Sequence, residues 1–131
     1  MGAFWFLKGK FMKVIFSSSA LVASMLIAAS VNATPFDGLY KSVHGTWTCT
    51  PEDIGLDGGS LGIQSNFLYG LESECELKNP TKVRGMDAVL YDTECTAEGE
   101  SYPSVRVMIM RHDDGLYMVR DGVVGDWRSC P

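Results

Sequence analysis

The sequence predicts an all-β protein: a small antiparallel meander of about seven short strands that closes into a barrel and carries two disulfides. Three observations lead to this prediction. Apolar and polar residues alternate in several short segments, turn sequences rich in glycine and aspartate separate them, and four cysteines lie in a chain of only 131 residues. No segment has a convincing helical period. Closure into a barrel is expected because it protects the edges of a short meander.

Residues 1–33 have the features of a secretory signal peptide that is cleaved after Ala33. Three lysines precede a long uncharged run, and the run ends in the small-residue pattern Val31-Asn32-Ala33. An uncleaved membrane anchor is the alternative, because the run is long enough to span a bilayer. The Ser and Ala content of the run and the cleavage pattern favour removal. Met12 would be a more ordinary start for such a segment than Met1.

Residues 34–131 are expected to form a single small β domain with a strong negative charge. All sixteen acidic residues but only eight of the eleven basic residues remain after cleavage, which gives a net charge of −8. Such a protein will not bind a nucleic-acid backbone, and anionic membranes repel it. The signal peptide predicts a periplasmic or secreted protein, and the negative charge predicts no membrane association after cleavage.

Four cysteines in a short exported domain indicate two disulfides. They are Cys49, Cys75, Cys95 and Cys130. Three pairings are open, but Cys75 and Cys95 are equally distant from Gly85, so a hairpin that turns there places these two thiols opposite each other. Cys49–Cys130 is then the second bridge, between the first and last strands. A competing turn at residues 78–81 would leave Cys75 and Cys95 about 25 Å apart, too far for a disulfide.

The other expected elements follow the alternation and the turn signals. A first strand covers residues 45–49 and a loop covers residues 51–60, while residues 34–44 lead in from the terminus. The later elements are a strand from Leu61, a turn at 64–66, the hairpin of 67–95, a turn at 96–101, and strands over 104–111, 116–120 and 123–130.

Residues 67–77 have the clearest alternation and are expected to form one strand. Its buried face would carry Phe67, Tyr69, Leu71, Ser73, Cys75 and Leu77, and its wet face Glu72, Glu74 and Glu76. In the hairpin centred on Gly85, Glu76 lies opposite Glu94. Like charges in that position are unfavourable unless a basic residue compensates.

Three short patterns point to chemistry, and each has a structural explanation that we prefer. Ser60 lies in a G-x-S-x-G pattern, but a nucleophile elbow needs a much larger α/β sheet. His44 and His112 have neither ligand spacing nor a recognisable nucleophile partner. Asp53 and Asp57 are too few carboxylates for a calcium loop. The sequence therefore predicts no enzyme, no metal site and no cofactor.

The glutamate ladder of residues 72–76 is the most concentrated acidic feature. A solvated outer face explains it without a partner. The functional interpretation is a docking surface for a basic protein, which the turn after residue 95 would extend. The residues predicted to bind are Glu72, Glu74, Glu76, Glu98, Glu100 and Tyr102.

Two parts of the chain resemble known proteins. One is Trp47-Thr48-Cys49 with the near-terminal Cys130, and the other is Glu72-Ser73-Glu74-Cys75 followed by Cys95-Thr96-Ala97-Glu98-Gly99. The pattern is similar to small exported, cystine-linked β-barrel proteins of Gram-negative bacteria. Periplasmic inhibitors of C-type lysozymes share the size, the export and the β-barrel build. Their inhibitory loop carries a Ser-Gly-x-x-Tyr element, and the nearest stretch here, residues 98–102, lacks the order of that motif.

We therefore expect an exported, non-catalytic binding or inhibitor-like module that docks a basic protein or envelope component through the acidic face. One alternative is a small lipocalin-like carrier of an apolar ligand, and another is a structural protein of the envelope. The side chains that could line the carrier's pocket are Met108, Met110, Met118, Trp47 and Trp127.

Overall fold

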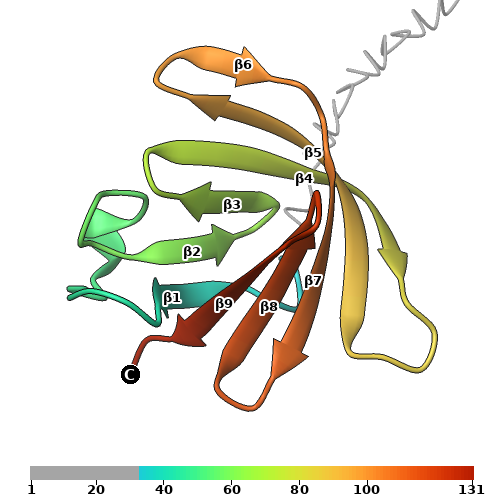
Figure 1. Ribbon diagram of the computed structural model, residues 1–131, viewed down its shortest axis with the longest axis horizontal. Helices are drawn as coiled ribbons and strands as arrows, with labels where there is room; N and C mark the ends of the chain where they lie inside the picture. The colour runs from blue at the N-terminus through green and yellow to red at the C-terminus, as the bar shows by residue number, and fades with distance from the viewer. Residues whose placement is uncertain (1–32) are drawn as a thin grey trace, which may run out of the picture.

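The computed structural model describes residues 33–131 and shows an all-β protein (Figure 1). Its elements are β1 (Gly38–Ser42), a short 3-10 helix (Pro51–Asp53), β2 (Leu61–Gln64), β3 (Phe67–Gly70), β4 (Ser73–Lys82), β5 (Ala88–Ala97), β6 (Glu100–Tyr102), β7 (Arg106–His112), β8 (Gly115–Arg120) and β9 (Val123–Ser129). Every pairing between these strands is antiparallel.

Eight of the strands close into a barrel, and β6 is an extra strand outside the closed circuit. Neighbours follow the order β4-β3-β2-β1-β9-β8-β7-β5, and a β4–β5 pairing completes the circle. Within the described residues, β6 pairs with β5 alone. The β5–β6 hairpin reaches beyond the other strands at one rim of the barrel (Figure 1). The predicted antiparallel barrel is confirmed, with eight strands where about seven were expected.

The core fills the barrel with inward side chains from the alternating positions of its strands. Ile109 of β7 and Leu116 of β8 are completely buried, as the two-residue period of a strand requires. Phe36, just before β1, is also completely buried. The Arg111 guanidinium lies 5.4 Å from the centre of its ring, and the Tyr40 hydroxyl donates to the Phe36 carbonyl at 2.6 Å. The segment that leads into β1 is thus part of the core.

The predicted hairpin and both predicted disulfides are confirmed. Cys75 lies opposite Cys95 in the β4–β5 ladder, and the two sulfurs are bonded. Cys49 and Cys130 form the second bridge, which ties the loop after β1 to the residue that follows β9.

The competing turn signal at residues 78–81 is a bulge inside β4. Asn79 has a φ of 50°, and the β4–β5 pairing shifts register at this point. Pro80 has no backbone N–H to donate to a ladder, so a bulge accommodates it. The strand continues past the bulge to Lys82.

Residues 67–77 form two strands, β3 and β4, and the prediction of one continuous strand is wrong. The chain reverses at Leu71 and Glu72, where Glu72 has a φ of 48°, and Gly70 pairs with Ser73. Glu72 is therefore a turn residue and not a member of the glutamate ladder.

Because of this reversal, two aromatic residues lie on the opposite face of the sheet from the one predicted. Phe67 pairs with Glu76 and Tyr69 pairs with Glu74. Because paired residues share a face of the sheet, both rings lie with the carboxylates on the outer face. Leu68, opposite Cys75, takes the buried position that the sequence assigned to its neighbours.

The N-terminal strand also lies elsewhere than predicted. Residues 45–49 form no strand, and residues 38–42, expected as a lead-in, form β1. The Thr48 and Cys49 amides donate to the carbonyls of Gly58 and Gly59, at 2.9 and 3.1 Å. These hydrogen bonds close a loop on itself, so its alternating residues never join the sheet. The turn predicted at 96–101 likewise contains the end of β5 and most of β6.

The predicted signal peptide lies, apart from Ala33, outside the described residues. In the part of the chain that the structure describes, no helix has the length and apolar character needed to cross a membrane. Two disulfides are typical of an oxidising compartment outside the cytoplasm.

Candidate functional site

A groove beside strands β3 to β6 brings carboxylates and aromatic rings together. Its volume is about 360 Å³, which is within the range of small-ligand sites. The side chains that give it its chemical character are Phe67, Glu74, Glu76, Glu94 and Tyr102. Thr96, Ser101 and Ser104 add hydroxyl groups to the lining. We call this the acidic groove.

Three local features of the sequence build the acidic groove. The tight β3–β4 turn places Phe67 opposite Glu76, and the β4–β5 register places Glu76 opposite Glu94. The β5–β6 hairpin then returns Tyr102 to a position beside Cys95. The disulfide at Cys95 fixes β5 against β4, so the groove rests on a cross-linked sheet.

Lys78 compensates the like-charge pair of Glu76 and Glu94. Its ammonium lies 2.9 Å from a Glu94 oxygen and 3.7 Å from a Glu76 oxygen. The hydrogen bond to Glu94, together with the two carboxylate charges, raises the pKa of Lys78 despite some desolvation. Lys78 thus supplies the basic residue that the predicted register requires, and it offsets part of the groove's negative charge.

Glu74 is the third carboxylate that lines the groove. It is exposed, and within residues 33–131 no basic side chain forms an ion pair with it. Burial raises the pKa of its cross-strand neighbour Tyr69, and the Glu74 carboxylate raises it further. An acidic side chain beside a phenol ring is therefore open to a cation from solvent.

The structure brings together some of the predicted binding residues and separates others. Glu74, Glu76 and Tyr102 line the acidic groove. Glu72 lies in the β3–β4 turn, where its amide donates to the Gly55 carbonyl at 2.7 Å. The two remaining residues, Glu98 and Glu100, are exposed on the β5–β6 hairpin and do not line the groove.

The sequence interpretation missed the aromatic wall of the groove. Phe67 was expected inside the barrel because its alternation with the glutamates looked continuous. The signal that could have corrected this is Gly70, three residues later, which offers the chain a place to turn between two short strands.

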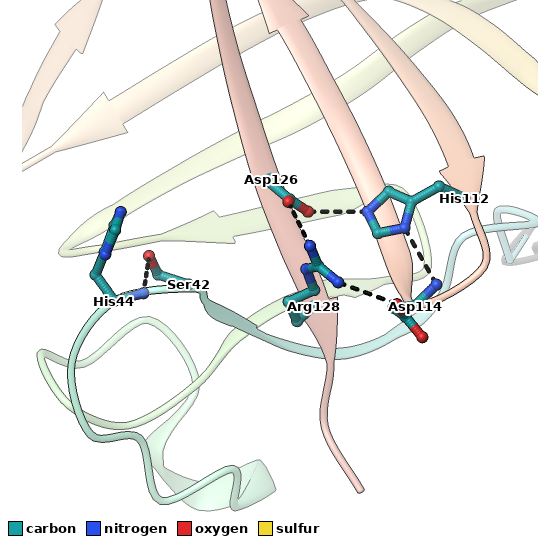
Figure 2. A network of polar contacts seen from close by, with 6 residues as sticks. All are labelled: Ser42, His44, His112, Asp114, Asp126 and Arg128. Atoms are coloured by element: carbon teal, nitrogen blue, oxygen red, sulfur yellow. Dashed lines mark hydrogen bonds and ion pairs between the residues drawn. The ribbon is translucent and has the colours of Figure 1, made fainter.

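Two side chains of the weak catalytic patterns, Ser60 and Asp53, have structural partners. The Ser60 hydroxyl is completely buried and donates to the Thr50 carbonyl at 2.9 Å. The Asp53 carboxylate accepts hydrogen bonds from the Thr48 and Thr50 hydroxyls at 3.0 and 2.9 Å. His44 is exposed, and its backbone amide donates to a serine hydroxyl within β1 (Figure 2).

His112 belongs to a polar network on the outside of β7, β8 and β9 (Figure 2). Its Nε2 lies 2.9 Å from an Asp126 oxygen, and its Nδ1 accepts the Asp114 backbone N–H at 3.1 Å. Arg128 joins the two aspartates through contacts of 2.9 and 3.1 Å, and the Tyr117 ring lies 4.4 Å from the imidazole, centroid to centroid. Both ring nitrogens are engaged, so the imidazole has no free nitrogen with which to act as a base.

The side chains proposed for an apolar pocket do not surround a common space. Met108 and Met110 pair with Val119 and Tyr117 on the outer face of the sheet, whereas Met118 points into the core. Trp47 and Trp127 are partly buried at the edge of the core. The small internal cavity beside Met118 has a volume of about 10 Å³.

No group of three or more potential metal ligands is assembled within residues 33–131.

The fold and the groove together define a class: a disulfide-linked antiparallel β-barrel with an acidic, aromatic-lined groove on its outside. No family model, curated protein or solved structure matches the chain. The groove is therefore the feature of the molecule that points to a function.

Proposed function

We propose that the protein is an exported, non-catalytic binding module, located in the periplasm or secreted, that docks a basic protein or envelope component in the acidic groove. The observation that supports this proposal is the convergence of Glu74, Glu76 and Glu94 with Phe67 and Tyr102 around one groove of about 360 Å³. This arrangement favours a lysine or arginine side chain as the group that is bound.

A basic side chain can interact both with the carboxylates and with the aromatic rings that line the groove. Carboxylates attract the cationic head, and an aromatic face adds an attraction of about 0.5–1 kcal/mol at an exposed site. The apolar stem of lysine or arginine can lie along Phe67 while its charged head reaches a glutamate. A neutral or anionic ligand would offer no cationic partner to Glu74, the carboxylate of the groove that Lys78 does not contact.

The net charge acts at longer range than the groove. With a charge of −8 over residues 34–131, the protein attracts basic partners before contact, which raises the association rate at low salt. The groove then supplies the specific contacts. The long-range attraction by the net charge and the contacts in the groove can be separated by experiment.

The test is calorimetric titration of a lysine hexapeptide into protein expressed from the full chain with its disulfides formed. The test variant carries Glu74→Gln, Glu76→Gln and Glu94→Gln. We expect the affinity to fall by about threefold to about 150-fold, because three exposed charge contacts of about 0.2–1 kcal/mol each are lost. Affinity for the unchanged protein should also fall between about 20 mM and about 200 mM salt.

The matched control removes three carboxylates outside the groove. Glu52→Gln, Asp57→Asn and Asp113→Asn change the net charge by the same amount at exposed or loop positions. This control should retain most of the affinity. Equal losses in the two triple variants would show that only net charge attracts the peptide, and the proposed groove function would be wrong.

A further inference from the structure

Strand β6 has, among residues 33–131, a free edge that is able to accept another strand. The β5–β6 hairpin turns through Glu98 and Gly99, which have φ values of 51° and 78°, and Ala97 pairs with Glu100 across the turn. In a two-residue hairpin the closing pair is hydrogen-bonded and the next pair is not. The next pair is Thr96–Ser101, so the N–H and C=O of Ser101 point away from β5, toward the open side.

The disulfide supports this assignment of the hydrogen-bonding pattern. Cys95 pairs with Tyr102 on the β6 side and with Cys75 on the β4 side. Because the hydrogen-bonding groups of Cys95 point to β6, its pairing with Cys75 is of the non-hydrogen-bonded type, in which the Cα atoms are closer. Their Cα–Cα distance is 4.0 Å.

The free edge separates two recesses of different chemistry. On the outer face lies the acidic groove, to which Ser101 contributes. On the inner face lies a second recess of about 520 Å³. Its lining includes the Cys75–Cys95 disulfide, Ala97, Pro103 and Val105, so it is largely apolar. Tyr102 borders both recesses.

We propose that the β6 edge binds an extended segment of a partner protein in which basic and apolar residues alternate. A strand added beside β6 would hydrogen-bond to the backbone of Ser101, and its side chains would point alternately to the two faces. The residue beside Ser101 faces the acidic groove, and its neighbours face the apolar recess. This proposal rests on the proposed function and specifies the conformation and sequence pattern of the partner.

A second copy of the chain fits the edge less well than a basic peptide. A second copy would bring together two molecules that each carry a charge of −8 over residues 34–131, and Glu98 and Glu100 add negative charge close to the edge. Molecules with such net charges repel each other. Charge complementarity therefore favours a basic partner segment.

Two peptides of identical composition test the proposal. One is Val-Lys-Val-Lys-Val and the other is Lys-Lys-Val-Val-Val, both acetylated and amidated, so that charge and hydrophobicity are matched and only the alternation differs. Against protein expressed from the full chain, the alternating peptide should bind about fivefold tighter or more, the equivalent of one backbone hydrogen bond or more.

A protein variant tests the backbone contact. Ser101→Pro removes the free N–H without removing a β5–β6 hydrogen bond, and Ser101→Ala is its control, since it removes only the hydroxyl. Ser101→Pro should abolish the preference for the alternating peptide, and Ser101→Ala should keep it. Disulfide formation and circular dichroism check that each variant is folded.

The possible results distinguish this proposal from the function on which it rests. If both peptides bind equally well and both are weakened by the triple glutamine variant, the groove binds cations but the edge proposal is overturned. If neither peptide binds, both proposals are overturned. A dimer of the unmodified protein that Ser101→Pro dissolves would assign the edge to a second copy and would also overturn the edge proposal.

Discussion

At the scale of single residues, Lys78 controls how negative the acidic groove is. It contacts both members of the Glu76–Glu94 pair and holds its charge because these contacts raise its pKa. A cationic ligand must therefore compete with Lys78 for those two carboxylates. The lysine stabilises the empty groove and weakens its binding to a cation.

Replacing this lysine should have opposite effects on binding and on stability. We expect Lys78→Met to bind the lysine hexapeptide about two- to fivefold more tightly, because one competing charge contact is removed. Thermal stability at low salt should decrease slightly, since Glu76 and Glu94 then repel each other. Lys82→Met is the control, because Lys82 lies in the same strand but outside the groove. Weaker binding by Lys78→Met would contradict the account of the groove.

Asp126 links the protein's stability to pH. Burial acts to raise the pKa of this carboxyl, but hydrogen bonds from Arg128 and His112 and their charges outweigh it, and the net effect is a lowered pKa. A carboxyl with a lowered pKa in the folded state stabilises the protein above its unfolded pKa, near 4. This stabilisation is lost as the pH falls through the folded value.

The expected result is a loss of stability on acidification that depends on Asp126. Between about pH 5 and about pH 2, the melting temperature should fall less steeply for Asp126→Asn than for the unmodified protein. At neutral pH the same variant should be less stable, because Arg128 and His112 lose a partner. Asp113→Asn, at the exposed tip of the neighbouring hairpin, should leave the slope unchanged. Equal slopes for the unmodified protein and Asp126→Asn would exclude this network as an acid-sensitive element.

At the scale of elements, the two disulfides act on different parts of the fold. Cys75–Cys95 joins adjacent strands over a separation of 20 residues, whereas Cys49–Cys130 joins the loop after β1 to the chain end over 81 residues. In the chain-entropy model, a disulfide that closes a longer loop lowers the conformational entropy of the unfolded chain by a larger amount.

Removing each bridge should therefore have unequal effects on the free energy of unfolding. Chemical denaturation should show a loss of about 4–5 kcal/mol for Cys49→Ala with Cys130→Ala, and about 3 kcal/mol for Cys75→Ala with Cys95→Ala. A larger loss for the β4–β5 bridge would mean that packing of the buried Cys75 sulfur outweighs the entropy of the unfolded chain.

The elements also show which parts of the fold could be predicted from the sequence. The equal distances of Cys75 and Cys95 from Gly85 predicted the hairpin. The prediction succeeded because a disulfide between adjacent strands requires its two cysteines to lie opposite each other, and this fixes the register of the strands. The hairpin turn is centred between Gly85 and Met86, where Lys82 pairs with Val89, and the one-residue bulge at Asn79 shifts the register so that Cys75 lies opposite Cys95 as predicted.

The errors arose where alternation continued without the expected structure. Leu71 and Glu72 form a turn although neither is a typical turn residue, so residues 67–77 read as one strand. Residues 45–49 alternate like a strand, but their backbone groups bond within their own loop. Short alternating segments predict a strand only when the sheet offers them a partner, and that depends on the rest of the fold.

At the scale of the whole molecule, the candidate site was only partly predictable. The sequence placed Glu74, Glu76 and Glu94 on one ladder because strand pairing fixes such neighbours. Tyr102 was also among the predicted binding residues, because a turn was expected between residues 96 and 101. Phe67 joined them only through the β3–β4 turn, which the alternation of residues 67–77 concealed. Strand β6 extends the sheet beyond β5 (Figure 1) and contributes Ser101 and Tyr102 to the lining of the groove.

The central claim is that a cation binds in the acidic groove, and amide NMR during titration with the lysine hexapeptide tests it most directly. We expect the largest chemical-shift changes on residues of β3, β4, β5 and β6 around Phe67, Glu74, Glu94 and Tyr102. Residues of the β8–β9 hairpin should change little. Changes spread over all acidic surfaces, or concentrated on the loop of residues 51–60, would contradict the claim.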